Sequence, residues 1–448
     1  MSVRSSSAAL RLALVATALA LLPRPAAADL VDLIPTLFGT RVVLAPPPPG
    51  FPSHEAHFLD SSLALAATGR TMNASLLEQI SAFPIASSAG GFTYNFDSSL
   101  GTFTRSTDSF GPVYTERAET IGRGRWNLGV NYLQETYDKL DGLSLDSSGI
   151  PFQLRHLDTP PTDSNPNDVP EPFFEGDVIG VREQVRVKTS TLVLYGNYGV
   201  TDRLDLSIAV PMVKVDIAAR ATLTINHLST FAQPQIHQFV GGGDTETVAA
   251  SDSASGVGDV LVRGKYRFVQ GASGGFAVAL DVRLPTGDEK NLLGTGATQT
   301  RLTFIGSGQS GILGVHGNLG YSVSSGGGAV IADVPNELSY AAGLDVAVHP
   351  RLTLAGEVVG RMLYNATRAE VDQVHHVYQA GPAGPTQTVD LPQVAFTKDD
   401  VNLLLGSVGV KFNPVGNLLL SADALYPLGN QGLRDTGVTA VVGAEYSF

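Results

Sequence analysis

The chain has 448 residues, with 29 Lys and Arg, 42 Asp and Glu and no Cys, and its formal net charge is −13. This acidic balance argues against a sequence-independent nucleic-acid binder, which needs a basic surface. The lack of Cys excludes disulfides, thiolate nucleophiles and thiolate-bound metals. A charged fraction of 16% with 49 glycines is also unusual for a soluble globular domain, where about 25% of residues are charged.

Residues 1–28 have the parts of a secretory signal peptide. Arg4 and Arg11 are positively charged, residues 12–22 are apolar, and Ala26 and Ala28 are the small residues expected before a cleavage site. The apolar run is too short for a membrane-spanning helix, which needs about 20 residues. We therefore predict export, with cleavage after Ala28.

Residues 29–121 show no regular alternation of polar and apolar side chains. Pro46–Pro49 predict a stiff extended stretch, and Ser75 and Glu78 have the spacing of a capping box that would open a short helix. Two interpretations of this segment stay open: a plug in the lumen of a barrel, or a periplasmic tether.

A period of two residues dominates from about residue 124 onward, as expected for strands with two different faces. In residues 276–284, Phe276, Val278 and Leu280 share one face, whereas Asp281 and Arg283 lie on the other. The pattern predicts twelve strands, at about 124–138, 177–198, 203–226, 255–269, 275–285, 299–308, 312–324, 335–348, 351–369, 396–412, 416–426 and 435–448.

Two irregularities accompany this pattern. Residues 92–97 and 102–106 could form one more hairpin, which would make fourteen strands. The apolar phase also slips after Pro211 and again between Val187 and Leu192. A slip of this kind predicts a β-bulge.

The connections between the predicted strands alternate strictly between short and long. Short turns lie at 199–202, 270–274, 308–311, 349–350 and 413–416, and long connections at about 139–176, 227–254, 285–297, 325–334, 371–395 and 427–434. Outer-membrane barrels have short periplasmic turns and longer external loops. We therefore predict an all-β antiparallel transmembrane barrel over residues 122–448, in contact with the lipids of a Gram-negative-type outer membrane and with both ends periplasmic.

The polar faces of these strands carry charges of both signs. A basic residue facing lipid at the bilayer midplane would cost roughly 2–4 kcal/mol, so these side chains are predicted to face the lumen. There they could line a solute pathway, hold a plug or pair across neighbouring strands. The candidates are Arg203, Asp205, Asp259, Arg263, Lys265, Arg267, Asp281, Arg283, Glu357, Arg361 and Asp423.

The chain ends in an aromatic pattern. Tyr446 and Phe448 share one face of the last predicted strand, three and five residues after Gly443. A terminal aromatic of this kind resembles the signal that the barrel-assembly machinery reads, and an exposed strand edge can be recognised by β-augmentation. The ending therefore predicts that machinery as a partner.

Histidines supply the remaining candidates for chemistry. His54 with His57, and Asp372 with His375 and His376, have spacings that could bind a metal, but neither set has clear further ligands. We interpret them as solvated loop residues, and His316 as a polar residue of the lumen. No catalytic residue, metal site or cofactor is predicted.

Two stretches, 256–266 (GVGDVLVRGKY) and 281–296 (DVRLPTGDEKNLLGTG), resemble a group of outer-membrane transporters associated by name with the meta-cleavage pathway of phenol degradation. That group is distantly similar to fatty-acid and aromatic-hydrocarbon channels. The resemblance implies passive uptake of small hydrophobic or aromatic solutes without catalysis. The alternatives are a structural or adhesive barrel without transport, and a barrel hydrolase.

Overall fold

The computed structural model describes residues 29–448 except 40–41, 51–57, 81–90, 98–101, 106–108, 157–175, 272, 329, 331–332 and 382–383. The predicted signal peptide, His54 and His57 lie outside the described residues. Within them, no helix is both long and apolar enough to cross a membrane.

Twelve antiparallel strands form a closed barrel, which confirms the predicted fold and strand number. Closure is made by β3, which pairs with β19 on one side and β7 on the other, while β7 also pairs with β8. The strands are β3 (Trp126–Tyr137), β7 (Val178–Gly199), β8 (Leu204–Asn226), β10 (Val260–Gln270), β11 (Gly274–Leu284), β12 (Thr298–Ser310), β13 (Leu313–Ser325), β14 (Asn336–His349), β15 (Leu352–Gln379), β16 (Thr386–Val415), β17 (Leu418–Pro427) and β19 (Thr439–Ser447).

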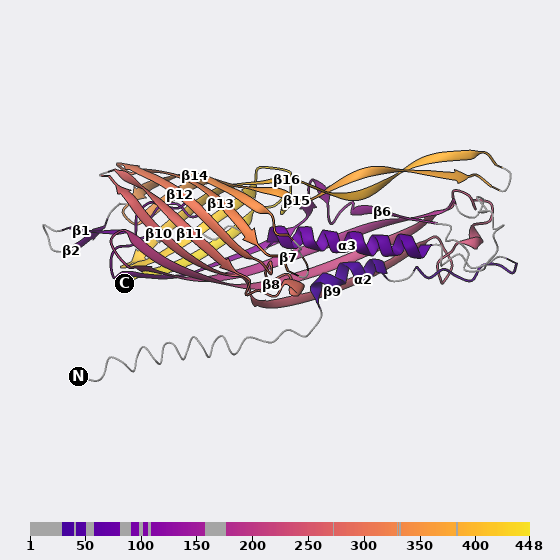
Figure 1. Cartoon of the computed structure of the whole chain (residues 1–448), viewed down its shortest axis with the longest axis horizontal. Helices are drawn as coiled ribbons and strands as arrows, with labels where there is room; N and C mark the ends of the chain where they lie inside the picture. Colours follow the sequence, from indigo (N-terminus) through magenta and orange to yellow (C-terminus); the bar gives the residue numbers. More distant parts are fainter. Residues whose placement is uncertain are drawn as a thin grey trace, which may run out of the picture.

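The outer wall of the barrel is apolar although it is exposed. Phe276 and Phe304, for example, are 56% and 57% exposed. Such a wall fits lipid rather than water. Aromatic pairs lie near the short-turn end, with the rings of Trp126 and Tyr198 4.4 Å apart, as in the aromatic girdles of membrane barrels. The C-terminus lies at this same end (Figure 1).

A second region, here called the extension, is formed where strands of the barrel continue beyond its far end (Figure 1). It contains the distal parts of β7, β8, β15 and β16, together with β6 (Ile150–Arg155) and β9 (Thr245–Val257). Helices α2 (Leu33–Gly39) and α3 (Leu59–Ile80) pack against its strands, and aliphatic side chains form a common core. The predicted long connection at 371–395 is therefore largely strand, and those at 139–176 and 227–254 contain the strands β6 and β9, which corrects the sequence interpretation.

Short elements complete the chain. β1 (Tyr94–Asp97) and β2 (Thr102–Arg105) form a separate two-stranded sheet, so the alternative of fourteen barrel strands is wrong. β4 (Lys139–Leu140), β5 (Leu143–Ser144) and β18 (Leu433–Arg434) form a small sheet, and η1 (Leu30–Asp32), η3 (Pro234–Ile236) and η4 (Glu289–Asn291) are single 3-10 turns.

The phase slip near Pro211 is not a bulge. β8 pairs with β7 in one unbroken register from Asp205 to Asn226. Before Pro211 the apolar side chains face outward to lipid, and after it Val215 and Ile217 face inward to the core of the extension. The environment of the strand changes, whereas its register does not. The slip between Val187 and Leu192 has the same cause, because β7 pairs with β3 without a shift.

The predicted capping box is also wrong. Ser75 and Glu78 lie in the last turns of the 22-residue α3 rather than at a helix start. They bind β15 instead: the Ser75 hydroxyl donates to the carbonyl of Thr367 at 3.1 Å, and the Glu78 carboxylate accepts from the Thr367 amide at 3.1 Å. These polar contacts attach the end of α3 to the wall where the barrel passes into the extension.

Candidate functional site: the barrel lumen

Residues 109–121, here called the crossing segment, lie inside the barrel near its short-turn end. The segment begins beside β15, where the amide of Phe110 donates to Thr353 Oγ1 at 3.0 Å. It ends beside β8, where the amide of Ile121 donates to Asp205 Oδ2 at 3.1 Å. In between, the amides of Glu116 and Ala118 donate to Asn318 on β13 and Ser307 on β12. The backbone therefore spans the lumen from one wall to the other.

Glu357 holds the start of this segment. Its carboxylate accepts backbone N–H bonds from Val113 at 2.6 Å, Tyr114 at 2.9 Å and Thr115 at 2.6 Å, together with the Thr115 hydroxyl. The residue is only 4% exposed. A buried carboxylate needs such donors, because an unpaired buried charge is expensive. One side chain thus fixes three consecutive residues of the segment.

Two buried lysines bind backbone carbonyls of the crossing segment. Lys265 Nζ donates to the carbonyls of Arg117 at 3.2 Å and Glu119 at 2.8 Å, and lies 3.9 Å from the Asp205 carboxylate. Lys411 Nζ donates to the carbonyls of Phe110 and Pro112 on the opposite side of the barrel. The segment is therefore held at its amides by the carboxylates of Glu357 and Asp205 and by neutral acceptors, and at its carbonyls by cations.

An ion-pair network extends this arrangement along the wall. Arg263 donates to Asp281 at 2.8 Å and also pairs with Glu116 of the crossing segment. Arg301 donates to the same Asp281 at 3.2 Å, and Arg267 lies 3.7 Å from Glu119. Charges predicted from alternation on β10 and β11 thus meet charges of the N-terminal segment, and the two signs compensate inside the lumen.

Asp259, which lies in the stretch 256–266, has a structural role. Its buried carboxylate accepts from the amides of Gly287 at 3.0 Å and Thr295 at 2.9 Å and from the Thr295 hydroxyl at 3.1 Å. These bonds fold the loop 285–297 against the lumen. As a result Leu292 and Leu293 are buried and belong to the same core as α3.

The other predicted lumen residues lie in different surroundings. Arg361 donates to Glu337 at 2.6 Å, and Asp423 accepts from the Ser407 hydroxyl at 2.9 Å. Arg283 is buried beside the cavity described next. Arg203 differs from all of these, because it precedes β8 in a turn and is exposed.

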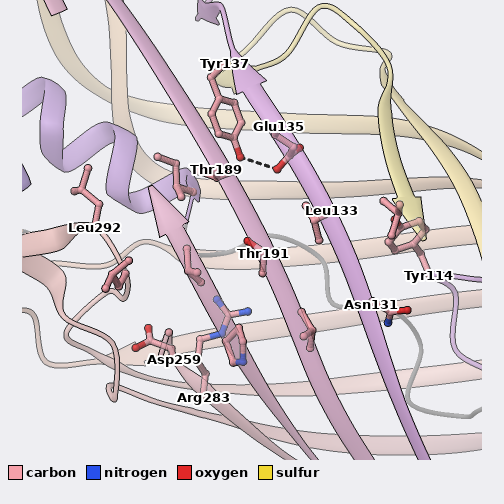
Figure 2. A pocket seen from close by; sticks show the side chains of 17 residues that line it. Tyr114, Asn131, Leu133, Glu135, Tyr137, Thr189, Thr191, Asp259, Arg283 and Leu292 are labelled. Carbon is pink, nitrogen blue, oxygen red and sulfur yellow. Dashed lines mark hydrogen bonds between the residues drawn. The ribbon is translucent and has the colours of Figure 1, made fainter. Parts of the chain in front are cut away.

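A cavity of about 70 Å³ lies between α3, the loop 285–297 and the crossing segment (Figure 2). Ile80 of α3 and Leu292 and Leu293 of the loop border one part of it, and Tyr114 of the crossing segment borders another. A volume of this size holds several water molecules. The strands contribute Asn131, Leu133, Glu135, Tyr137, Thr189, Thr191, Val193, Pro211, Val213, Gly258, Asp259, Arg283 and Val441.

The cavity has aliphatic walls with a few polar groups. Leu133, Val193 and Val441 supply apolar surface, whereas Asn131 and Arg283 place polar groups toward the short-turn side. At the other side the Tyr137 hydroxyl donates to Glu135 Oε2 at 2.8 Å, as the dashed line in Figure 2 shows. Apolar walls with a few convergent polar groups are typical of small-molecule sites.

Histidines form no metal centre in the described residues, where no cluster of three or more potential ligands has suitable geometry. His375 pairs with Asp390 across the β15–β16 ribbon, and His376 Nε2 lies 2.8 Å from the carbonyl of Gly176. His316 is buried and pairs with Asp345, which also accepts from the Ser109 hydroxyl.

At the C-terminus, Tyr446 and Phe448 are about half exposed on the outer wall, with ring centres 5.6 Å apart. Gly443 faces the other way. A Cβ there would lie 2.2 Å from Asn131 Oδ1 and 2.6 Å from Ser421 Oγ. A larger residue at this position would therefore displace the side chains of Asn131 and Ser421.

Sequence reasoning missed the partners on the crossing segment. The charged run 116–119 (ERAE) was the available signal, because it directly precedes the first barrel strand and cannot belong to a lipid-facing surface. Lys411 was a second signal, since it stands between the outward-facing Val410 and Phe412 of β16. Neither signal indicates a partner by itself, because the contacts join residues that are up to about 300 positions apart.

The sequence matches the model of one protein family. The model described as "Putative MetA-pathway of phenol degradation" matches residues 161–397, which is more than half of the chain. No protein with a curated description matches the sequence.

Several solved barrels are similar in structure. An outer-membrane channel from Pseudomonas putida F1 is 15% identical, with 74% of this chain and 98% of that chain covered at a TM-score of 0.41. The translocator domain of the autotransporter NalP from Neisseria meningitidis is 11% identical, with 73% and 89% covered at 0.33. A FadL homologue from Pseudomonas aeruginosa is 12% identical, with 74% and 90% covered at 0.29.

Proposed function

Since this chain belongs to the "Putative MetA-pathway of phenol degradation" family, we propose that it is an outer-membrane channel for the passive uptake of small hydrophobic or aromatic molecules. The observation that carries the proposal is the mainly aliphatic cavity inside a closed, lipid-facing barrel. Its walls suit an apolar ring, and the polar groups at its borders suit a hydroxyl.

The N-terminal part would then control the channel. The crossing segment closes the short-turn side of the cavity, and α3 with the loop 285–297 borders the opposite side. A solute can pass only if one of these segments moves. We therefore assign residues 29–121 to a plug rather than to a periplasmic tether, and residues 122–448 to the barrel.

Catalysis is not part of this proposal. A catalytic triad places the serine hydroxyl beside the imidazole. Here the Ser109 hydroxyl donates to Asp345, and His316 contacts the same carboxylate from its other side. The acid lies between the two groups, so that the imidazole is not aligned to take the hydroxyl proton.

The same proposal covers targeting and assembly. Export through a signal peptide cleaved after Ala28 would deliver the chain to the periplasm. The outward aromatic pair Tyr446 and Phe448 would then be available to the barrel-assembly machinery on the last strand. Deletion of Phe448 is expected to reduce insertion of the barrel while the precursor is still cleaved.

Uptake of phenol into liposomes tests the channel. Thr191 lines the cavity, whereas its neighbour Leu192 faces lipid and is 36% exposed. Thr191→Trp should fill the cavity and reduce phenol flux at least about tenfold, and Leu192→Trp should leave it unchanged. Equal flux through both variants would refute the cavity as the path. No flux through the unmodified protein would favour the structural or adhesive barrel.

A further inference from the structure

The outer face of β7 and β8 changes character just beyond the apolar wall. On β7, Leu194 and Leu192 are exposed and apolar, and the next outward positions are Ser190 and Lys188. On β8, Lys214 is the first charged residue after the lipid-facing stretch. This change from apolar to basic side chains marks the height at which hydrocarbon ends and the charged surface of the membrane begins.

Basic residues continue outward from this boundary. On β7, Arg186 is two residues from Lys188 and Arg182 is four residues further, and Arg220 lies on β8. Register places Arg186 opposite Ala218 and Arg220 opposite Gln184, so that the two guanidinium groups are diagonal neighbours. We call Arg182, Arg186, Lys188, Lys214 and Arg220 the basic strip.

The strip has few acidic neighbours: Asp216 lies opposite Lys188 in the strand register, and Asp146 lines the same surface depression as Arg186 and Arg220. Among the described residues, only Lys214 has a carboxylate within 4 Å, at 2.7 Å from Asp216. The lumen cations Arg263, Lys265 and Arg267, in contrast, all have acidic partners. The three exposed arginines Arg182, Arg186 and Arg220, which have no carboxylate of the described residues within 4 Å, stand out in a chain whose net charge is −13.

Small side chains next to the arginines leave an open hollow. Ala218, Ala249 and Ser251 lie beside Arg186 and Arg220 in the lining of a surface depression of about 580 Å³. Arg182 and Arg186 are four residues apart, which is about 13 Å along a strand. The strip therefore suits several anionic groups that are spread outward from the membrane boundary.

We propose that the basic strip binds phosphate groups of the glycolipid in the outer leaflet, lipopolysaccharide. Guanidinium groups bind phosphate with two parallel hydrogen bonds, and basic residues beside a membrane are attracted to its anionic headgroups. The proposal rests on the membrane placement given above, with the extension outward, and not on transport. The strip then anchors the extension against the leaflet that surrounds it.

Binding of lipopolysaccharide to the purified full chain in a neutral detergent tests this proposal. Arg186→Glu with Arg220→Glu should weaken binding at least about tenfold, because attraction becomes repulsion at two contacts. The matched control is Arg123→Glu with Arg351→Glu, which places the same charge change on exposed residues of the short-turn end. The control should bind as the unmodified chain does.

Three further measurements distinguish the outcomes. Lipopolysaccharide stripped of its lipid A phosphates should bind poorly to the unmodified chain, whereas inorganic phosphate at millimolar concentration should displace little intact glycolipid. Phenol flux should be unchanged in the strip variant, which separates this proposal from the channel. Equal glycolipid binding by the strip variant and the control would overturn the proposal, and so would full competition by inorganic phosphate, because the strip would then be a simple ion site.

Discussion

The barrel lumen and the extension are both filled by N-terminal residues, but with a different balance of charged and apolar contacts. In the lumen, the crossing segment is bound by charged side chains of the wall, such as Glu357 and Lys265. In the extension, α3 buries Met72, Leu76 and Leu77 in an aliphatic core. The same two strands, β7 and β8, contribute to both regions without a break in register.

The difference teaches how the two contacts constrain position. Apolar packing is nondirectional and roughly proportional to area, so that α3 is held by the total surface that it buries. A buried charge needs a specific partner, so that each lumen charge fixes particular atoms of the crossing segment. The crossing segment therefore depends more on individual hydrogen bonds than α3 does, although Val113 and Tyr114 also pack against apolar residues of the wall.

The strongest test of this comparison is Glu357→Ala. The change leaves three buried amides of residues 113–115 without their acceptor, and loss of one partner of a buried charged contact costs about 3–5 kcal/mol. We expect the crossing segment to detach and single-channel conductance to rise severalfold. The control is Glu370→Ala, an exposed acid on the same strand, which should leave the conductance unchanged. Unchanged conductance in Glu357→Ala would show that the segment does not block the lumen.

Leu76→Ala probes the extension in the same way. The side chain is fully buried on α3, and its truncation should cost about 2–4 kcal/mol through lost burial and a new cavity. Chemical denaturation should show earlier unfolding of the extension, with the membrane barrel unaffected. Leu63→Ala on the same helix is the control, because Leu63 is 58% exposed and should change stability by less than about 0.5 kcal/mol. Simultaneous unfolding of both regions would contradict their separation.

Lys411→Met is expected to have a smaller effect in the lumen. The thioether fills similar space but cannot donate to the carbonyls of Phe110 and Pro112. Leaving buried carbonyls without a donor costs about 1–3 kcal/mol. Brief conductance bursts should become more frequent, at lower amplitude than in Glu357→Ala. A variant with the noise of the unmodified chain would indicate that the lysine is not needed to hold the segment.

Much of the barrel was predictable because lipid imposes a strict rule on the strands. Every outward side chain must be apolar, so the two-residue period gave the twelve strands, and the polar face indicated residues such as Asp281 and Glu357. The rule stops at the membrane surface. Above it the core lies inside, as at Val215 and Ile217, and the reversed phase was interpreted as a bulge.

The partners in the lumen were less predictable for a different reason. Alternation reports which way Lys265 and Glu357 point, but a backbone segment that lacks periodicity carries no sign of what it touches. The long β15–β16 ribbon was missed because apolar and polar side chains alternate irregularly over residues 371–395: Val371 and Val377 are exposed, whereas Val394 is buried in the core of the extension. A pattern of period two requires one face of a strand to stay apolar along its length, and neither face of this ribbon does.

The smallest effect concerns pH and the outer loop of the extension. Buried Asp177 accepts from His227, His237 and Thr230. The hydrogen bond to Asp177 raises the pKa of His227, with a smaller contribution from Asp244. Burial alone would raise the pKa of Asp177, but its hydrogen bonds from His227, His237 and Thr230 outweigh burial and lower it.

These two pKa shifts define the pH range in which the hydrogen bonds of Asp177 with His227 and His237 stabilise the loop. Because folding raises the pKa of His227, its stabilising contribution is complete below about pH 6.5, which is the ordinary histidine pKa. This contribution is lost as the pH rises through the pKa of His227 in the folded state. A lowered aspartate pKa contributes stability above about 4 that is lost only in stronger acid. Proteolysis within residues 227–244 should therefore be slower at pH 5.5 than at pH 8.5. The loop is more stable at the lower pH by about 1 kcal/mol or less. His227→Gln should remove the difference, and an unchanged pH dependence in that variant would assign it to another group.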